Sequence, residues 1–252
     1  VLLNDSYVTS SPFNLSVTSS SNGSTSISNN LITYSPDADY NGSDSFSYTI
    51  VQGEKISSAD VTVTIEAVND APSIDIASTI QIQENQTAVT TVAISDIDED
   101  ELTLTLDGVD SNSFNLSSEN VLTFKDPPDY ETKNSYLITL TLTDGTETLT
   151  KDITIAIIDI NDEAPEFTSN ATFSAAENQT AIGTVLATDA EGDTVTFTVS
   201  GNELAITSAG ILTFVSAPDY ETKASYTATV TASDGVNSNT QDITVNVTDV
   251  NE

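Results

Sequence analysis

The residues in this chain that are best suited to chemistry are acids, and they recur with the same neighbours in two copies. Three segments recur almost unchanged: Glu84-Asn85-Gln86-Thr87 at 177–180, Pro128-Asp129-Tyr130-Glu131-Thr132-Lys133 at 218–223, and Asp159-Ile160-Asn161-Asp162 at 249–252. The last two recur after 90 residues, from Asp129 to Asp219 and from Asp159 to Asp249. That period is the length of a small domain rather than of a solenoid unit. Repeated carboxylates are hard oxygen ligands, and their fixed places predict bound calcium.

The composition excludes several classes of function. The chain has no His, no Cys and no Trp, and its five basic residues are all Lys, which rules out imidazole-assisted nucleophiles, the usual zinc sites and disulfides. A formal net charge of −34 repels the phosphates of nucleic acids and anionic lipids. No run of about 18 apolar residues is present to cross a membrane. We therefore expect a cation-binding protein that is not an enzyme, does not bind nucleic acid and does not insert this segment into a membrane.

The elements that position these acids are predicted to be strands. Apolar or β-branched residues alternate with Thr or Asn in five segments: 102–106, 137–143, 153–157, 195–199 and 243–247. Turn-forming pairs separate them, at Asp107-Gly108, Asp144-Gly145, Ala209-Gly210 and Asp234-Gly235. Alternation with a period of two, interrupted every 8–12 residues by turns, is typical of antiparallel sandwiches with Ig-like topology. The sequence therefore predicts an all-β chain.

Two proline-containing junctions divide the chain. Asn69-Asp70-Ala71-Pro72 and Asn161-Asp162-Glu163-Ala164-Pro165 each lie between predicted strands, where a proline stiffens the link. They predict three tandem β-sandwiches, 1–70, 71–163 and 164–252, in an elongated array. The first has no early Glu-Asn-Gln-Thr segment, so we expect it to be divergent or truncated at its amino end. Because the chain begins and ends within the pattern, we expect it to be an excerpt of a longer protein.

The order of these acids makes the chain resemble the cadherin repeat. Five marks of that family are matched in order: an early Glu (Glu84, Glu177), an Asp-X-Glu pair (129–131, 219–221), an Asp-X-Asp-like pair (96–98, 189–191), a late Asp (Asp144, Asp234) and an Asp-X-Asn-Asp linker (159–162). The tyrosine within Pro-Asp-Tyr-Glu resembles the bacterial branch, and residues 1–70 resemble the tandem cadherin-like repeats of large bacterial surface proteins. The resemblance implies seven-stranded sandwiches with calcium between consecutive domains.

The resemblance implies one set of calcium ligands at each junction. At the 163/164 junction, expected to hold about three ions, they are Glu84, Asp129, Glu131, Asp159, Ile160, Asn161, Asp162, Glu163, Asp189, Glu191 and Asp234. At the 70/71 junction, expected to hold one or two ions, they are Asp39, Asn69, Asp70, Asp96, Asp98 and Asp144. The first junction is poorer in acids because Asn41 and Ala67 stand where Glu131 and Asp159 stand in the next module. Glu163 and Glu191 replace the family's usual Asn and Asp, which keeps oxygen ligands on longer side chains.

Simpler roles remain open for single residues. The two Asp-Gly pairs at 144 and 234 suit hairpin turns without any metal, and the run 96–100 suits a solvated acidic loop. That run is not an EF-hand, since no Glu follows at the twelfth position. Four aromatic residues are expected in the core rather than on a sugar-stacking surface: Phe124, Tyr130, Phe214 and Tyr220.

These observations predict a calcium-dependent rigid tandem module of a bacterial cell-surface or secreted adhesin, extracellular and membrane-associated through its parent. The expected partner is another surface protein, a like molecule in homophilic adhesion, or a glycan. The alternative is an extracellular carbohydrate-binding cadherin-like module, against which the lack of Trp and the aromatic content of 6% argue. A carboxylate-pair glycosidase is disfavoured because the acids map to domain ends rather than to one cleft. An ice- or mineral-binding surface made of Thr-rich strand faces is the least favoured alternative.

Overall fold

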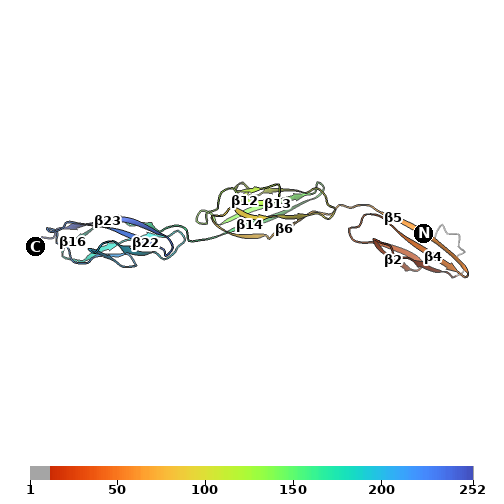
Figure 1. Cartoon of the computed structure of the whole chain (residues 1–252), viewed down its shortest axis with the longest axis horizontal. Helices are drawn as coiled ribbons and strands as arrows, with labels where there is room; N and C mark the ends of the chain where they lie inside the picture. Colours follow the sequence, from red (N-terminus) through yellow and green to blue (C-terminus); the bar gives the residue numbers. More distant parts are fainter. Residues whose placement is uncertain (1–11, 252) are drawn as a thin grey trace. The chain divides into compact units, whose positions relative to one another are not determined.

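The computed structural model describes residues 12–251, and nearly all of its regular structure is strand (Figure 1). One short 3-10 turn, Ser111–Ser113, is the only helical element in that range. Contacts divide the chain into two compact units. The first takes in the residues up to Ile76 with 93–105 and 141–151, and the second takes in 77–92, 106–140 and the residues from Asp152 onward. The all-β class predicted from the alternation is confirmed.

The first group of strands consists of β1 (Asn14–Val17), β2 (Gly23–Ser28), β3 (Leu31–Pro36), β4 (Gly42–Gln52) and β5 (Lys55–Ile65). β1, β4 and β5 form one sheet in that order, and β2 and β3 form a hairpin. Asn29 and Asn30 turn the hairpin with φ of 51° and 60°, a backbone conformation that Asn tolerates better than most residues. Alternate residues of β4 are buried, namely Phe46, Tyr48 and Ile50, so this strand supplies the core of the group.

An acid is buried in the first group. Asp44 is 5% exposed, and its carboxylate accepts hydrogen bonds from Ser21 N (3.3 Å), Asn22 N (3.1 Å), Tyr34 Oη (3.0 Å) and Ser45 N (2.8 Å). Burial alone would raise the pKa of Asp44, but these hydrogen bonds outweigh it and leave the pKa lowered. The same environment raises the pKa of Tyr34 to about 12, through burial first and the Asp44 carboxylate next. The acid therefore fastens the 20–22 loop to the core strand.

We expect Asp44→Asn to lower the melting temperature of the first group by several degrees, because an amide offers one acceptor oxygen where the carboxylate offers two. In the parent chain, a folded-state pKa below the unfolded value means that Asp44 stabilises the fold above pH ~4 and loses that effect as the pH falls through the folded pKa. Thermal melts from pH 7 to pH 3 measure both effects. Equal acid sensitivity in the variant and the parent would contradict this role.

The second group contains nine strands: β6 (Ser73–Asp75), β7 (Thr79–Gln83), β8 (Ala88–Thr91), β9 (Ala93–Ser95), β10 (Thr103–Asp107), β11 (Phe114–Leu116), β12 (Val121–Phe124), β13 (Ser135–Thr143) and β14 (Thr148–Ile158). Its sheets have the orders β10-β13-β14-β7, β11-β12-β8 and β6-β9. The fully buried side chains include Leu122, Ile138, Leu140, Ile153 and Ile155. They come from both larger sheets, which pack face to face as a sandwich.

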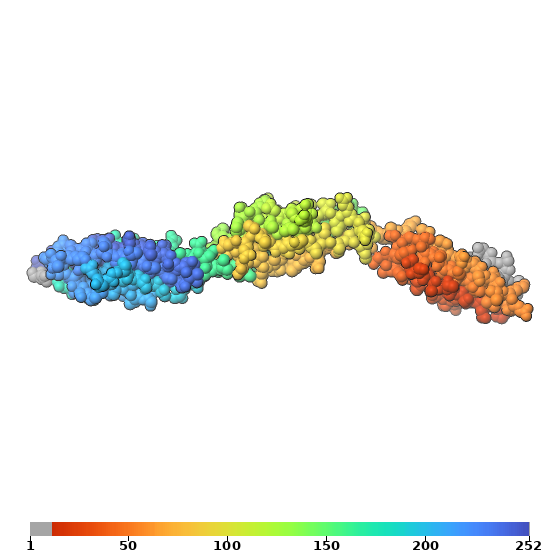
Figure 2. Space-filling view, in the orientation of Figure 1, coloured from red at the N-terminus to blue at the C-terminus, as the bar shows by residue number. Residues whose placement is uncertain are grey.

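The third group repeats this plan with β15 (Glu166–Phe167), β16 (Thr172–Ala176), β17 (Ala181–Thr184), β18 (Ala187–Thr188), β19 (Thr196–Val199), β20 (Leu204–Ile206), β21 (Ile211–Phe214), β22 (Ser225–Ser233) and β23 (Ser238–Thr248). Its sheets have the orders β16-β23-β22-β19, β17-β21-β20 and β15-β18. Its core is one cluster that includes Val185, Leu212, Val230, Ile243 and Val245. Figure 2 shows the outer surface of each group, coloured along the sequence.

Most sequence predictions about the strands are confirmed. All five alternating segments form strands, and the glycines of the four predicted turns have positive φ. Most pairs are antiparallel as expected, but β7 runs parallel to β14 and β16 runs parallel to β23. Phe124 and Phe214 are core residues, with exposures of 3% and 2%. The prediction was wrong for Tyr220, which is 38% exposed because its loop is fixed through its backbone, and Tyr130 is half-buried.

Candidate metal centres

The early glutamates of the repeat are buried and bind backbone N–H groups. Glu84, which directly follows β7, is 2% exposed, and its carboxylate accepts hydrogen bonds from Ile160 N (2.9 Å) and Tyr130 N (2.8 Å). Glu177 follows β16, is 3% exposed, and accepts them from Val250 N and Tyr220 N at 2.8 Å each. Each carboxylate oxygen keeps a free lone pair. The glutamates can therefore fasten two loops and still coordinate a cation.

Glu84 belongs to a cluster of acids that share one small space. Carboxylate oxygens of Glu84, Glu131 and Asp159 lie within 4.8 Å of one another, and those of Glu131, Asp162 and Glu191 do the same. Burial raises the pKa of Glu131, and the neighbouring charges of Glu84, Asp159 and Glu191 raise it further. The pKa of Asp159 is likewise raised, by burial first and then by Glu84 and other acids. Like charges this close repel by about 1 kcal/mol per pair in water and more where water is excluded, so the cluster favours a bound cation.

The linker after β14 bonds to loops of the third group. Asn161 donates from Nδ2 to Asp193 Oδ2 (2.6 Å), and its own Oδ1 accepts from Asn237 Nδ2 (2.7 Å). Glu163 donates its backbone N–H to Glu191 Oε1 (3.2 Å). These bonds bring linker oxygens beside the loop acids. The predicted ligands from both sides of the linker therefore lie in one region.

Several buried oxygens have no hydrogen-bond partner in residues 12–251. Four of them belong to acids predicted as ligands: Asp96 Oδ2, Asp189 Oδ2, Glu191 Oε2 and Asp234 Oδ2. A buried polar atom without a partner is costly, and an ion is one of the few explanations for it. Hard oxygen donors grouped in this way fit calcium, which takes about six to eight oxygens. The residues present therefore fit the metal that the sequence predicts.

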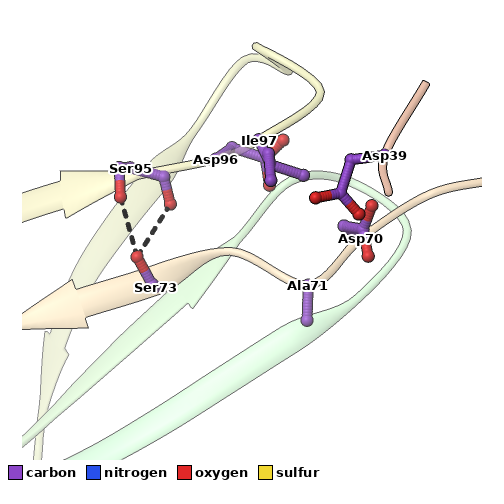
Figure 3. A pocket seen from close by; sticks show the side chains of 7 residues that line it. All are labelled: Asp39, Asp70, Ala71, Ser73, Ser95, Asp96 and Ile97. Carbon is purple, nitrogen blue, oxygen red and sulfur yellow. Dashed lines mark hydrogen bonds between the residues drawn. The ribbon is translucent and has the colours of Figure 1, made fainter. Parts of the chain in front are cut away.

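A second acidic site surrounds the Asn69-Asp70 segment. Asp39, Asp70 and Asp96 line a pocket of about 540 Å³ with Ala71, Ser73, Ser95 and Ile97, and the carboxylates of Asp39 and Asp70 lie close to each other (Figure 3). Asp70 N donates to Asp98 Oδ2 (2.7 Å) and Asn69 Nδ2 donates to Asp144 Oδ2 (2.9 Å). Burial raises the pKa of Asp70, and Asp39 and Asp98 raise it further. The six residues predicted for this site thus lie near one another.

Two aspartates hold tight turns as well as standing beside the acidic sites. Asp144 Oδ1 accepts from Thr146 N and Glu147 N, and Asp234 Oδ1 accepts from Val236 N and Asn237 N, all at 2.6 Å. Burial would raise the pKa of Asp234, but these N–H groups outweigh it and lower the pKa. The hairpin role weighed from the sequence is therefore present. The second oxygen of Asp234 points away from the turn bonds without a partner within residues 12–251, which leaves the ligand role open too.

Three predicted ligands also make hydrogen bonds within or between the loops. The carboxylate of Asp129 accepts from Thr132 N (3.0 Å) and Thr132 Oγ1 (2.8 Å), and these bonds lower its pKa. Asp129 is thus engaged by its own loop, in which it also contacts Glu131. Ile160 and Glu163 each donate their backbone N–H to a glutamate, and these bonds leave their oxygen atoms available to a metal.

Sequence reasoning missed some acids. Asp193 bonds to Asn161, and Asp100 joins Asp96 and Asp98 in a cluster. A further cluster, formed by Glu177, Asp219 and Glu221, lies after β16. Its signal was already in the repeat, since these three acids repeat Glu84, Asp129 and Glu131.

The sequence of this chain was compared with protein families and with known proteins. A family model described as the bacterial Ig domain matches residues 1–66 and 161–248, which is more than half of the chain. The chain belongs to the bacterial Ig domain family. Among curated relatives of this bacterial Ig chain, the Protocadherin-like wing polarity protein stan of Drosophila melanogaster is 35% identical over 235 residues, covering 79% of the chain and 6% of that protein. Human Cadherin-23 is 31% identical, covering 58% of the chain and 5% of that protein.

Solved structures show the same fold for this bacterial Ig chain. The protocadherin gammaB7 EC3-6 cis-dimer structure matches with a TM-score of 0.66 at 24% identity, covering 94% of the chain and 66% of that chain. Mouse Cadherin-23 EC22-24 matches with a TM-score of 0.64 at 19% identity, covering 94% and 86%. The predicted cadherin-like, Ig-like repeats are thereby confirmed. The chain spans about one-twentieth of the first curated relatives, and residues 12–251 contain no helix long and apolar enough to cross a membrane.

Proposed function

We propose that this chain is a calcium-binding tandem of cadherin-like Ig repeats, 1–70, 71–163 and 164–252, in which bound calcium stiffens the links of a bacterial cell-surface or secreted adhesin. The chain has no catalytic role in this proposal. Its location is extracellular or at the cell surface, and its partner is another surface protein or a like molecule. The names of the relatives, which are cadherins and a protocadherin-like protein, support the adhesive role.

The observation that carries the proposal is the set of buried carboxylate oxygens without partners in residues 12–251. Asp189, Glu191 and Asp234 each keep such an oxygen, and Glu191 also belongs to a cluster with Glu131 and Asp162. An acidic loop that only faces solvent would have no reason to bury oxygens without donors. A cation supplies the missing partner for all of them at once.

About three calcium ions are proposed for the richer site. Its eight predicted carboxylates come from Glu84, Asp129, Glu131, Asp159, Asp162, Asp189, Glu191 and Asp234, and Asp193 is a further candidate through Asn161. Calcium supplies positive charge there, and three ions would reduce a local charge of about −8 to about −2. The bonds of Asn161 and Glu163 then hold the linker against the acidic loops. Without calcium, carboxylate repulsion loosens the link.

The site around Asp70 is proposed to hold one or two ions and to bind more weakly. It offers five carboxylates, those of Asp39, Asp70, Asp96, Asp98 and Asp144, and both oxygens of Asp144 already accept hydrogen bonds. Since each calcium takes about six to eight oxygens, the five acids serve fewer ions than the richer site. No early glutamate equivalent to Glu84 contributes in residues 12–66.

We expect calorimetric titration of the full chain to show calcium binding at about 10⁻⁴–10⁻³ M, the range of extracellular calcium modules. Glu131→Gln should remove more bound calcium than Asp98→Asn, because Glu131 lies in two carboxylate clusters of the richer site. Glu119→Gln, which removes an exposed acid outside the clusters, serves as the matched control and should change nothing. Equal losses in the two site variants, or a greater loss in Asp98→Asn, would refute the assignment of ion numbers.

A further inference from the structure

In the second and third groups, the turn that carries the Asp-X-Glu pair ends with a lysine. This residue is Lys133 in the second group and Lys223 in the third. Each lysine forms an ion pair with one acid of another loop: Lys133 with Asp110, and Lys223 with Glu203 at 2.6 and 2.7 Å. The two ion pairs found within residues 12–251 thus occupy equivalent places in the repeat.

Lys133 also lies against the aromatic part of the core. Its Nζ is 4.6 Å from the centroid of the Tyr136 ring, and a cation over an aromatic ring is attracted to it. Tyr136 packs edge-on against Phe114 and Phe124, with ring centroids 5.8 and 4.9 Å apart. The lysine side chain is therefore fastened to the packed interior of the second group as well as to an acid.

The acid that holds Lys133 is itself fixed in place. Asp110 Oδ2 accepts the backbone N–H of Leu137 in β13 (2.8 Å), and the Asp110 side chain is only 15% exposed. The Lys133 side chain first, and the Leu137 N–H next, lower the pKa of Asp110. Exposed ion pairs often contribute little because both side chains must be ordered to form them. Here the acid is already ordered, so the pair fixes the end of the turn.

The turn 129–133 holds Glu131 at its middle. It closes on itself through the bond from Lys133 N to Asp129 O (2.9 Å). Its first half is fastened by the bond from Tyr130 N to Glu84 (2.8 Å), and its last residue is fastened by the lysine side chain. The backbone of Glu131 is thus held between an anchored first half and an anchored end.

Glu131 depends on this turn for its place among the acids. Its carboxylate is shared by two clusters, one with Glu84 and Asp159 and the other with Asp162 and Glu191. A side chain that serves two clusters must have its backbone in one place. Residues that orient a metal ligand without touching the metal commonly change metal affinity by about 10-fold or more when they are removed.

We propose that Lys133 is a positioning residue for the richer site: by holding the end of the turn 129–133 against Asp110 and Tyr136, it keeps Glu131 in place for both clusters. This role rests on the calcium binding proposed above, and Lys133 itself does not touch the metal. Its charge gives no advantage there, because a cation repels calcium. Its value to the site is therefore the fixed end that it gives the turn.

The direction of the change in calcium affinity separates positioning from charge. Lys133→Met removes a positive charge and leaves the Asp110 carboxylate without its cation, so electrostatics alone predicts tighter calcium binding. Positioning predicts binding that is weaker by about three- to tenfold, because the turn around Glu131 must then be ordered when the metal binds. Lys133→Arg keeps the charge, the pairing with Asp110 and the contact with Tyr136, so it should bind calcium as the parent does.

The test is a calcium titration of the ¹⁵N-labelled full chain, in which the amide shifts of Asp162 and Glu191 report the affinity of the richer site. Two lysine variants are the controls. Lys125→Met removes the same charge from the second group, where the lysine Nζ donates to a backbone carbonyl at 2.8 Å. Lys223→Met loosens the matching turn, whose Glu221 belongs to a different cluster. Both controls should bind calcium at the richer site as the parent does.

A second measurement needs no metal. In EDTA, ¹⁵N relaxation should show a more mobile Glu131 amide in Lys133→Met than in the parent or in Lys125→Met. Unchanged or tighter calcium binding by Lys133→Met, or a loss that Lys133→Arg does not restore, would overturn the positioning role and leave the calcium binding of the parent intact. A parent chain that binds no calcium would refute the proposed function, and the positioning role with it.

Discussion

In millimolar calcium the chain is expected to melt at a markedly higher temperature than in chelator. Metal that binds only the folded state stabilises it by RT ln(1 + [L]/Kd), which at ~1 mM calcium and a Kd of about 10⁻⁴–10⁻³ M is about 0.4–1.4 kcal/mol for each independent site. The folded chain gathers carboxylates such as Glu84, Glu131 and Asp159 within 4.8 Å of one another, whereas an unfolded chain disperses them. Differential scanning calorimetry in calcium and in EDTA measures the difference.

Magnesium provides the control for this experiment. It carries the same charge but demands near-ideal octahedral geometry and keeps much of its water, so it should raise the melting temperature far less. If magnesium raised the melting temperature as much as calcium does, the effect would be general screening of the net charge of −34. Identical melting curves in calcium and in EDTA would refute calcium binding altogether.

The second large effect is expected from Glu84→Ala. Glu84 is 2% exposed and accepts the N–H groups of Ile160 and Tyr130, and its removal leaves these two half-buried donors without their carboxylate partner. Each such donor costs about 1–3 kcal/mol, so the second group should lose a large part of its stability even in chelator. Denaturant unfolding followed by tyrosine fluorescence in EDTA measures this loss, and Glu119→Ala is the control.

Glu84→Gln separates the two roles of this side chain. The amide keeps one acceptor oxygen and nearly the same volume, so it should recover part of the stability in chelator. It lacks the negative charge, so it should not recover calcium affinity. Glu177→Ala, with the same two backbone bonds in the third group, should reproduce the loss of stability there. Full stability of Glu84→Ala in EDTA would mean that the buried carboxylate serves only as a ligand.

The sequence specified the strands better than their pairing. Alternation in segments such as 137–143 and 243–247 reports which face of a strand is buried, and the structure has strands at each of them. The parallel pairing of β7 with β14 joins residues 75 positions apart, Thr79 and Thr154, and no local pattern encodes such a partner. Register at that distance is decided by packing across the whole sandwich.

For the acids, too, the sequence showed which residues recur but not which distant residues they contact. Repetition identified Glu84 as special, but its bonds to Ile160 N and Tyr130 N depend on loops that only the fold brings together. Asp129 was predicted as a ligand from its place in the repeat, and its two oxygens also accept hydrogen bonds from Thr132, three residues on. A short Asp-X-X-Thr contact of this kind is a common local motif. Asp193 was missed because only the fold brings it beside Asn161 and Asp159.

The parallel pairing of first and last long strands has a mechanical consequence. If tension is applied to the two ends of the second group, β7 is drawn one way and β14 the other, along the direction of both strands. The hydrogen bonds between Thr79–Gln83 and residues 154–158 then bear the load together in shear, instead of opening one after another. The parallel pair of β16 and β23 would bear load in the same way in the third group. A tether made of such repeats resists extension.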